Sequence, residues 1–144
     1  MAELLVRDLM TEKVYTVRPE DTVSELVQLL NEIDVRHMPV IDEDGTLVGL
    51  VSHRDLLRSA AAERADVPLS MGRELMRRTL VGEVMNEDVE TIEADASIRR
   101  AAEIMLENKY GCLPVVDGTR LVGILTEADF VRYLGERSRL AAAG

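Results

Sequence analysis

Two short motifs combine a hydroxyl with a carboxylate at the spacing of one helical turn. In GLVSHRD, Ser52 precedes Asp55 by three positions, and in GILTEAD, Thr126 precedes Asp129 in the same way. A Ser or Thr followed three residues later by an acid is a common helix start, because both side chains satisfy free backbone N–H groups. The same groups have a second use. A helix N-terminus attracts a phosphate, the hydroxyl donates a hydrogen bond to it, and the carboxylate accepts ribose hydroxyls.

Both motifs close one copy of an internal repeat. Residues 5–42 align with 80–117, and residues 47–55 align with 121–129 after a turn that is one residue shorter in the second copy. A length change of this kind is tolerated on a turn. The predicted organisation is repeat 1 at 1–58, a helical linker at 59–79, repeat 2 at 80–134 and a tail at 135–144.

Each copy is expected to fold in the order β-α-β-β-α. Apolar spacing predicts helices at 22–33 and 97–108, and Thr22 with Glu25 forms a capping-box pattern. A second helix is expected after Ser52 and after Thr126. Strands are expected at 14–17, 38–42 and 47–51, and at 89–92, 113–117 and 121–125, with Asp-Gly turns inside each hairpin.

Three further expectations concern prolines and the segments outside the repeats. Pro39 and Pro114 are placed at the beginnings of strands, where proline is tolerated. In the linker, Ala-rich 60–65 extends the preceding helix, Pro68 ends it, and MGRELMRR forms another turn or two of helix. The tail is expected to be frayed helix.

The segment order, present twice, resembles a tandem pair of CBS domains, the module named after cystathionine β-synthase. The resemblance covers nearly the whole chain. It rests on VRDLMTEKVYTVRPEDTVSELVQLL and RHMPVIDEDGTLVGLVSHRDLL, and on their counterparts VGEVMNEDVETIEADASIRRAAEIML and GCLPVVDGTRLVGILTEADFVRYL. It implies an α/β fold of two pseudo-twofold-related β-α-β-β-α repeats packed through their sheets, in a stand-alone Bateman module that forms a homodimer.

The resemblance also implies a regulatory ligand. Clefts between CBS repeats bind adenosine-containing molecules such as AMP, ADP, ATP or S-adenosylmethionine, and no tightly bound cofactor is expected. Main-chain groups near 14–16 would read the adenine edge, and Gly49 would let a ligand or another backbone come close. Core packing is the alternative for the apolar members of the site. The predicted ligand-binding residues are Ser52, Arg54, Asp55, Arg36, His37, Met38, Val14, Thr16, Thr126 and Asp129.

The two copies differ in the basic residues around their motifs. Arg54 lies inside the first motif. Arg36 and His37 directly precede the apolar strand expected at 38–42. Arginine forms bidentate, charge-assisted hydrogen bonds with phosphate. The first motif is therefore predicted to hold a phosphorylated ligand, whereas the second takes a less charged adenosine moiety or stays empty. A solvated surface is the alternative for the three basic residues. The matching positions of the second copy hold Gly111, Cys112 and Ala128, and Glu127 adds a negative charge.

Composition excludes several classes of function. The net charge of −10 disfavours nucleic acid and an acidic membrane surface as partners. Apolar runs are too short to span a bilayer, and no signal-peptide layout is present, so a cytoplasmic location is expected. Cys112 is the single cysteine, which excludes an internal disulfide framework and a cysteine-based metal cluster. His37 and His53 have no catalytic setting and no glycine-rich phosphate loop is present, so an enzyme is not expected.

These observations predict a non-catalytic regulatory module. It would bind an adenine nucleotide and signal to a separate partner protein by a conformational or dimer rearrangement, which requires different ligand affinities in its two states. The linker at 59–79 is a candidate partner or dimer surface, or a packing helix. The alternative function is a dimeric interaction scaffold whose clefts bind nothing.

Overall fold

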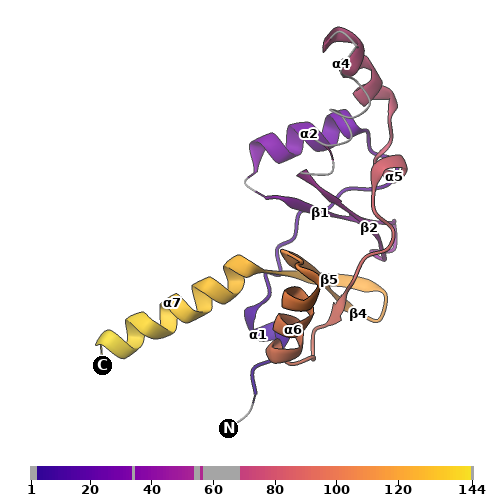
Figure 1. The fold of residues 1–144 in the computed structure, drawn as a ribbon. Helices are drawn as coiled ribbons and strands as arrows, with labels where there is room; N and C mark the ends of the chain where they lie inside the picture. Colours follow the sequence, from indigo (N-terminus) through magenta and orange to yellow (C-terminus); the bar gives the residue numbers. More distant parts are fainter. Residues whose placement is uncertain (1–2, 34, 54–55, 57–68, 144) are drawn as a thin grey trace. The chain divides into compact units, whose positions relative to one another are not determined.

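The chain folds into two compact units in a computed structural model, which describes residues 3–33, 35–53, 56 and 69–143 (Figure 1). Unit 1 comprises residues 1–14 and 90–144, and unit 2 comprises residues 15–89. Helices and strands are both present in each unit, as an α/β fold requires. In the part of the chain that the structure describes, no helix is long and apolar enough to cross a membrane.

Unit 2 contains a β-hairpin covered by α2 (Figure 1). Thr22 and Glu25 form the predicted capping box, because the Glu25 N–H donates to Thr22 Oγ1 at 3.1 Å and the Thr22 N–H donates to Glu25 Oε2 at 3.0 Å. This local signal explains why the helix begins where the sequence predicts. The elements of unit 2 are α2 (Val23–Glu32), β1 (His37–Ile41), β2 (Leu47–Ser52), α4 (Leu69–Arg78) and α5 (Val81–Val84).

Unit 1 contains a three-stranded sheet in the order β3-β4-β5, in which β3 is parallel to β4 and β4 is antiparallel to β5. Ser97 caps α6 by accepting a hydrogen bond from the Arg100 N–H at 3.1 Å. Figure 1 shows α7 leaving the end of β5 and extending beyond the sheet. The elements of unit 1 are α1 (Val6–Leu9), β3 (Ile92–Glu93), α6 (Ile98–Asn108), β4 (Cys112–Asp117), β5 (Arg120–Thr126) and α7 (Glu127–Ala143).

The first strand of each repeat is shorter than predicted. The predicted strand at 14–17 is reduced to one parallel bridge between Val17 and Val40, and the one predicted at 89–92 is the two-residue β3. Reverse turns follow at once and end the extended backbone. The Asp21 N–H donates to the Arg18 carbonyl at 3.0 Å, and an equivalent bond of 3.1 Å follows β3.

The two strand prolines lie inside strands, which corrects their predicted place at the beginnings. Pro39 is the third residue of β1, and Pro114 is the third residue of β4. Proline has no backbone N–H, so its nitrogen must lie on the side of the strand where the neighbouring strand needs no donor. The Pro39 carbonyl accepts a hydrogen bond from the Val17 N–H at 3.1 Å. The proline backbone therefore faces Val17, and the β1–β2 ladder loses no donor.

Two four-residue helices were not predicted from the sequence. Each packs on a segment of its own unit that is distant along the chain. In α1, the Val6 N–H donates to the Ala96 carbonyl at 2.8 Å. In α5, the Val81 N–H donates to the Asp21 carbonyl at 2.7 Å. The first 14 residues thus complete the unit of the second repeat, and residues 80–89 complete the unit of the first. The boundaries of the compact units therefore differ from those predicted for the sequence repeats.

Each unit has its own aliphatic core. Val6, Leu113 and Leu125 belong to the core of unit 1, and Leu26 and Val51 belong to that of unit 2. The helix predicted within MGRELMRR is confirmed as part of α4, and α7 runs through most of the predicted tail. The predicted extension at 60–65 and the helix break at Pro68 lie outside the described residues, as does most of the helix predicted after Ser52.

Candidate functional site

Thr126 and Asp129 meet at the junction of β5 and α7, where a buried carboxylate is surrounded by donors. Asp129 Oδ2 accepts hydrogen bonds from the Thr126 N–H at 2.8 Å and from Thr126 Oγ1 at 3.3 Å. Asp129 Oδ1 accepts hydrogen bonds from Thr11 Oγ1 at 3.0 Å and from Arg132 Nη1 at 3.1 Å. The Asp129 side chain is only 1% exposed. The helix-capping role predicted for this residue is confirmed, and the carboxylate also receives two donors from elsewhere.

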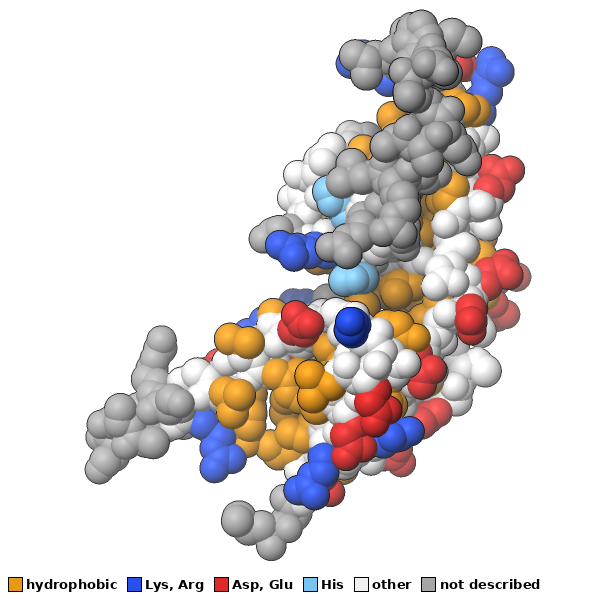
Figure 2. All heavy atoms as spheres, in the orientation of Figure 1, with side chains coloured by type: hydrophobic (Ala, Val, Ile, Leu, Met, Phe, Trp, Pro, Cys, Tyr) orange, Lys and Arg blue, Asp and Glu red, His pale blue; other side chains and the backbone are white. Residues whose placement is uncertain are grey.

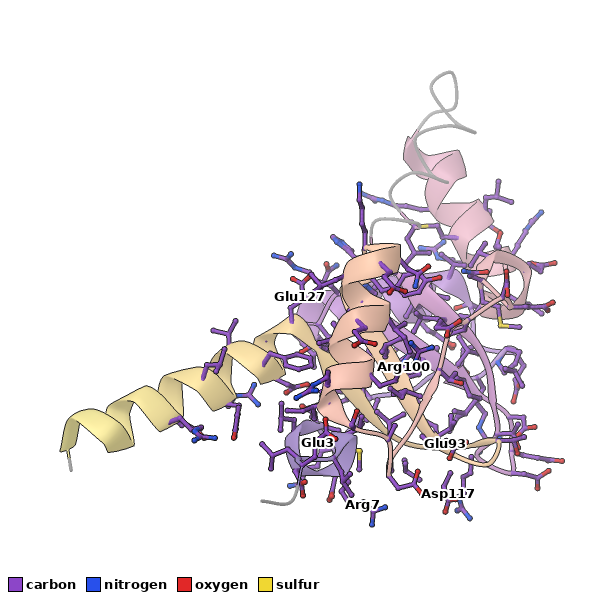
Figure 3. The ribbon with its side chains drawn as sticks, turned by 60° about the horizontal axis from the view of Figure 1, so that its bottom comes forward. Glu3, Arg7, Glu93, Arg100, Asp117 and Glu127 are labelled. Carbon is purple, nitrogen blue, oxygen red and sulfur yellow. The ribbon has the colours of Figure 1, made fainter. Side chains whose placement is uncertain are left out.

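Three elements hold this cluster in place. Thr126 ends β5 opposite Cys112. Glu127 lies where β5 passes into α7 (Figure 3). Its N–H donates to the Gly111 carbonyl at 3.3 Å, which fixes the beginning of α7. The backbone of Thr11 pairs with Ile124 through reciprocal hydrogen bonds of 2.9 and 3.0 Å. The N-terminal segment therefore lies beside β5, where the Thr11 hydroxyl reaches the carboxylate one helical turn into α7.

Arg132 is a member of the cluster that the sequence analysis missed. It follows Asp129 by three residues on the same helix, a spacing that places two side chains on one face. Its side chain is 60% exposed, while one guanidinium nitrogen contacts the buried carboxylate. The expectation that basic residues are missing around the second motif is therefore incomplete, because Arg132 supplies a cation there although Ala128 does not.

The strand register of unit 2 brings the predicted basic residues of the first copy close to Ser52. His37 is the Cα partner of Ser52 across the β1–β2 ladder, and the His53 N–H donates to the Arg36 carbonyl at 2.8 Å. Arg36 is exposed, whereas His37 and Ser52 are half-buried. The other two residues of this group, Arg54 and Asp55, lie outside the described residues. Their predicted contacts with phosphate and ribose stay predictions.

The predicted adenine-binding residues differ in burial and are divided between the two units. Met38 is fully buried in the core of unit 2, so its side chain serves packing. Val14 is half-buried in unit 1, whereas Thr16 is half-buried in unit 2. Their contacts with adenine stay a prediction.

Methionine side chains fill the space above the motif glycines. A Cβ atom on Gly49 would lie 2.6 Å from Met85 Sδ, and one on Gly123 would lie 2.7 Å from Met10 Sδ. The open approach predicted at Gly49 is thus used by Met85 of the same unit. A Cβ atom at either position would force the methionine side chain to shift, and at Gly123 it would also lie 3.0 Å from the Thr11 carbonyl oxygen.

The described residues offer no metal site, and acidic side chains are spread over the visible face (Figure 2). Among them, no three His, Cys, Asp or Glu side chains are grouped as metal ligands would be.

Burial raises the pKa of the Cys112 thiol from 9.0 to about 12. A thiol that stays protonated is a poor nucleophile, which fits a packing role for Cys112.

Comparison with known proteins places this chain in a family. The CBS domain pattern matches residues 6–62 and 81–136. The CBS domain-containing protein CBSX1, chloroplastic, of Arabidopsis thaliana is 38% identical in an alignment 147 residues long. The alignment covers 88% of this chain and 62% of that protein. This chain therefore spans less than two thirds of that relative.

Two solved structures of CBS pairs share the fold. CBSX2 from Arabidopsis thaliana, in complex with AMP, has a TM-score of 0.78 and 34% identity over 93% of this chain and 98% of its own. The CBS domain pair of MJ0100, in complex with 5′-methylthioadenosine and S-adenosyl-L-methionine, has a TM-score of 0.76 and 26% identity, with 94% and 99% covered. The two pattern matches and these neighbours agree on both repeats, and the chain belongs to the CBS domain family as a tandem pair.

Proposed function

We propose that this chain is a non-catalytic regulatory module that binds an adenosine-containing ligand, with AMP, ADP or ATP favoured over S-adenosylmethionine. Binding would change the arrangement of the module or of its homodimer, and a separate partner protein would respond to that change. The ligand must prefer one arrangement for this to work, since equal affinity for both shifts nothing.

The arrangement of Thr126 and Asp129 carries the proposal. A hydroxyl and a carboxylate lie together at the beginning of the 17-residue helix α7, and both belong to one motif that the chain repeats at Ser52 and Asp55. A helix N-terminus favours a phosphate, and a carboxylate accepts the paired hydroxyls of a ribose. Adenosine ligands combine these two groups.

The complexes of related CBS pairs support the choice of ligand class. AMP is bound in the CBSX2 structure, and 5′-methylthioadenosine and S-adenosyl-L-methionine are bound in that of MJ0100. All three molecules contain adenosine, although only AMP has a phosphate. Arg36 and His37 beside Ser52 favour a phosphorylated ligand here, because both side chains can carry positive charge near a hydroxyl donor.

Thermal unfolding with a panel of ligands tests the proposal. AMP, ADP, ATP, S-adenosylmethionine and NAD are each added at rising concentration, since a ligand that binds only the native chain raises its melting temperature. We expect at least one adenosine ligand to raise the melting temperature by several degrees in a saturable manner. A flat response to all five, together with no heat of binding in calorimetry, would refute ligand binding.

A dimeric interaction scaffold is the second candidate, and the surface of α7 favours it. Val131 is 69% exposed and Leu134 is 62% exposed on this helix, where Figure 2 shows hydrophobic side chains. Apolar side chains at a spacing of three residues form one helical face, and exposed apolar faces are typical of protein contacts. A chain that dimerises without responding to any ligand would support the scaffold.

A further inference from the structure

The carboxylate that the proposed function assigns to ribose is already occupied. Asp129 accepts four hydrogen bonds, from the Thr126 N–H, the Thr126 hydroxyl, the Thr11 hydroxyl and Arg132. A carboxylate has about four lone-pair positions, so these donors use its capacity. The side chain is also buried. A ribose can therefore reach Asp129 only by replacing some of these donors.

A ribose cis-diol that binds both oxygens needs one acceptor position on each. On Oδ2, the Thr126 N–H cannot leave without uncapping α7, whereas the Thr126 hydroxyl makes a longer bond of 3.3 Å. The hydroxyl of Thr126 is therefore the donor that leaves Oδ2. Once released, it can donate to another acceptor of the ligand.

On Oδ1, the choice lies between Arg132 and Thr11. The bond from Arg132 is charge-assisted, and its departure would leave a buried carboxylate without a cation. The bond from Thr11 comes from a neutral hydroxyl at 3.0 Å, so it is the weaker of the two. Thr11 can give up this bond without leaving its place, because its backbone remains paired with Ile124.

We propose that Thr11 is an internal competitor of the ligand. Its hydroxyl holds Asp129 in the ligand-free protein, and a ribose hydroxyl takes its place when the ligand binds. This inference rests on the proposed function of the second motif and adds a positioning residue from the N-terminal segment. It also narrows the ligand class to nucleosides and nucleotides with a free cis-diol.

Replacing the hydroxyl by a methyl group tests the competition directly. In Thr11→Val, the competing bond is lost at nearly constant volume, so the dissociation constant for AMP should fall about three- to ten-fold. The melting temperature of the ligand-free chain should fall at the same time. A structural role alone would lower stability without tightening binding. Calorimetric titration measures the affinity, and 2′,3′-dideoxy-AMP, which lacks the diol, should show no gain.

Three control variants separate the explanations. Thr11→Ser keeps the hydroxyl and should bind AMP within about two-fold of the natural chain. Thr79→Val removes a hydroxyl that donates to the Leu75 carbonyl at 2.7 Å in unit 2, so it should lower stability and leave the affinity unchanged. Asp129→Asn identifies the binding event that depends on this carboxylate. If Thr11→Val does not fold, Thr11→Ala takes its place.

The outcomes distinguish the inference from the function on which it rests. Tighter AMP binding by Thr11→Val supports the inference, including the case in which only the variant binds measurably. Unchanged or weaker binding by Thr11→Val, with clear binding by the natural chain, overturns the inference and leaves the proposed function standing. AMP binding that survives Asp129→Asn unaltered also overturns it. Absence of AMP binding by both chains overturns the inference, and a flat response to all five ligands of the panel overturns the proposed function as well.

Discussion

Replacing Asp129 by alanine measures how much the carboxylate cluster contributes to the stability of unit 1. Loss of the capping-box bond from the Thr126 N–H to the Asp129 carboxylate costs about 1 kcal/mol. Loss of the buried bond from Thr11 to a charged acceptor costs about 1.5 kcal/mol. The pair with Arg132 adds less than about 1 kcal/mol, because that side chain is mostly exposed and the pair is screened by solvent. We expect the free energy of unfolding to fall by about 3 kcal/mol in total.

Urea denaturation without ligand measures this loss, and thermal unfolding should show a melting temperature lower by about 10 °C. Glu127→Ala is the matched control, because Glu127 belongs to the same helical turn but is exposed and makes only a helix-dipole contribution of about 0.5 kcal/mol. A loss below about 1 kcal/mol for Asp129→Ala would refute the reasoning, since the four hydrogen bonds would then contribute no more than a surface cap.

Three further predictions follow from packing, burial and the duplicated motif. Gly123→Ala should destabilise the chain by about 1–3 kcal/mol, since the new Cβ would meet Met10. Gly135→Ala in α7 places its Cβ in open space and should stabilise the chain by about 0.5–1 kcal/mol. Urea denaturation that ranks the two variants in the reverse order would contradict this. Burial keeps the Cys112 thiol protonated in the folded chain, so its contribution to stability is present below pH 9 and is lost as the pH rises toward 12. Cys112→Ala should flatten that decline in denaturation measured across this range, and an unaltered decline would assign it to other groups. If the first motif holds the phosphates, Asp55→Ala should abolish most of the ATP-induced thermal shift and Asp129→Ala much less, and equal losses would refute a single phosphate site.

Local signals predicted the helices and hairpins well. The Thr22 capping box and the apolar spacing after it are read within a few residues, and α2 begins and ends within one residue of its predicted range. The hairpin of β4 and β5 follows from apolar runs around a turn at Gly118, whose φ of 68° suits glycine. The contact between Thr126 and Asp129 was predictable for the same reason, because three residues separate them.

Contacts between distant segments could not be predicted in this way. Thr11 and Asp129 are 118 positions apart, and no local pattern indicates that they meet. The repeat alignment matches the N-terminal segment with residues near 80, but equivalence in sequence does not say with which copy each segment packs. α1 and α5 have four residues each, too few for an apolar period to show. Arg132 was visible at helical spacing but lay outside the motif.

The packing of the first 14 residues in unit 1, with residues 90–144, has a consequence for the order of folding. During synthesis, residues 15–89 emerge as a complete unit while the first 14 residues still lack the partner on which they pack. Val6 and Leu9 reach the core of unit 1 only after residues 90–144 have been made. The part of the chain made first is thus buried last. A fragment of residues 1–89, released from the ribosome, should protect unit 2 from protease and leave its N-terminus open to cleavage.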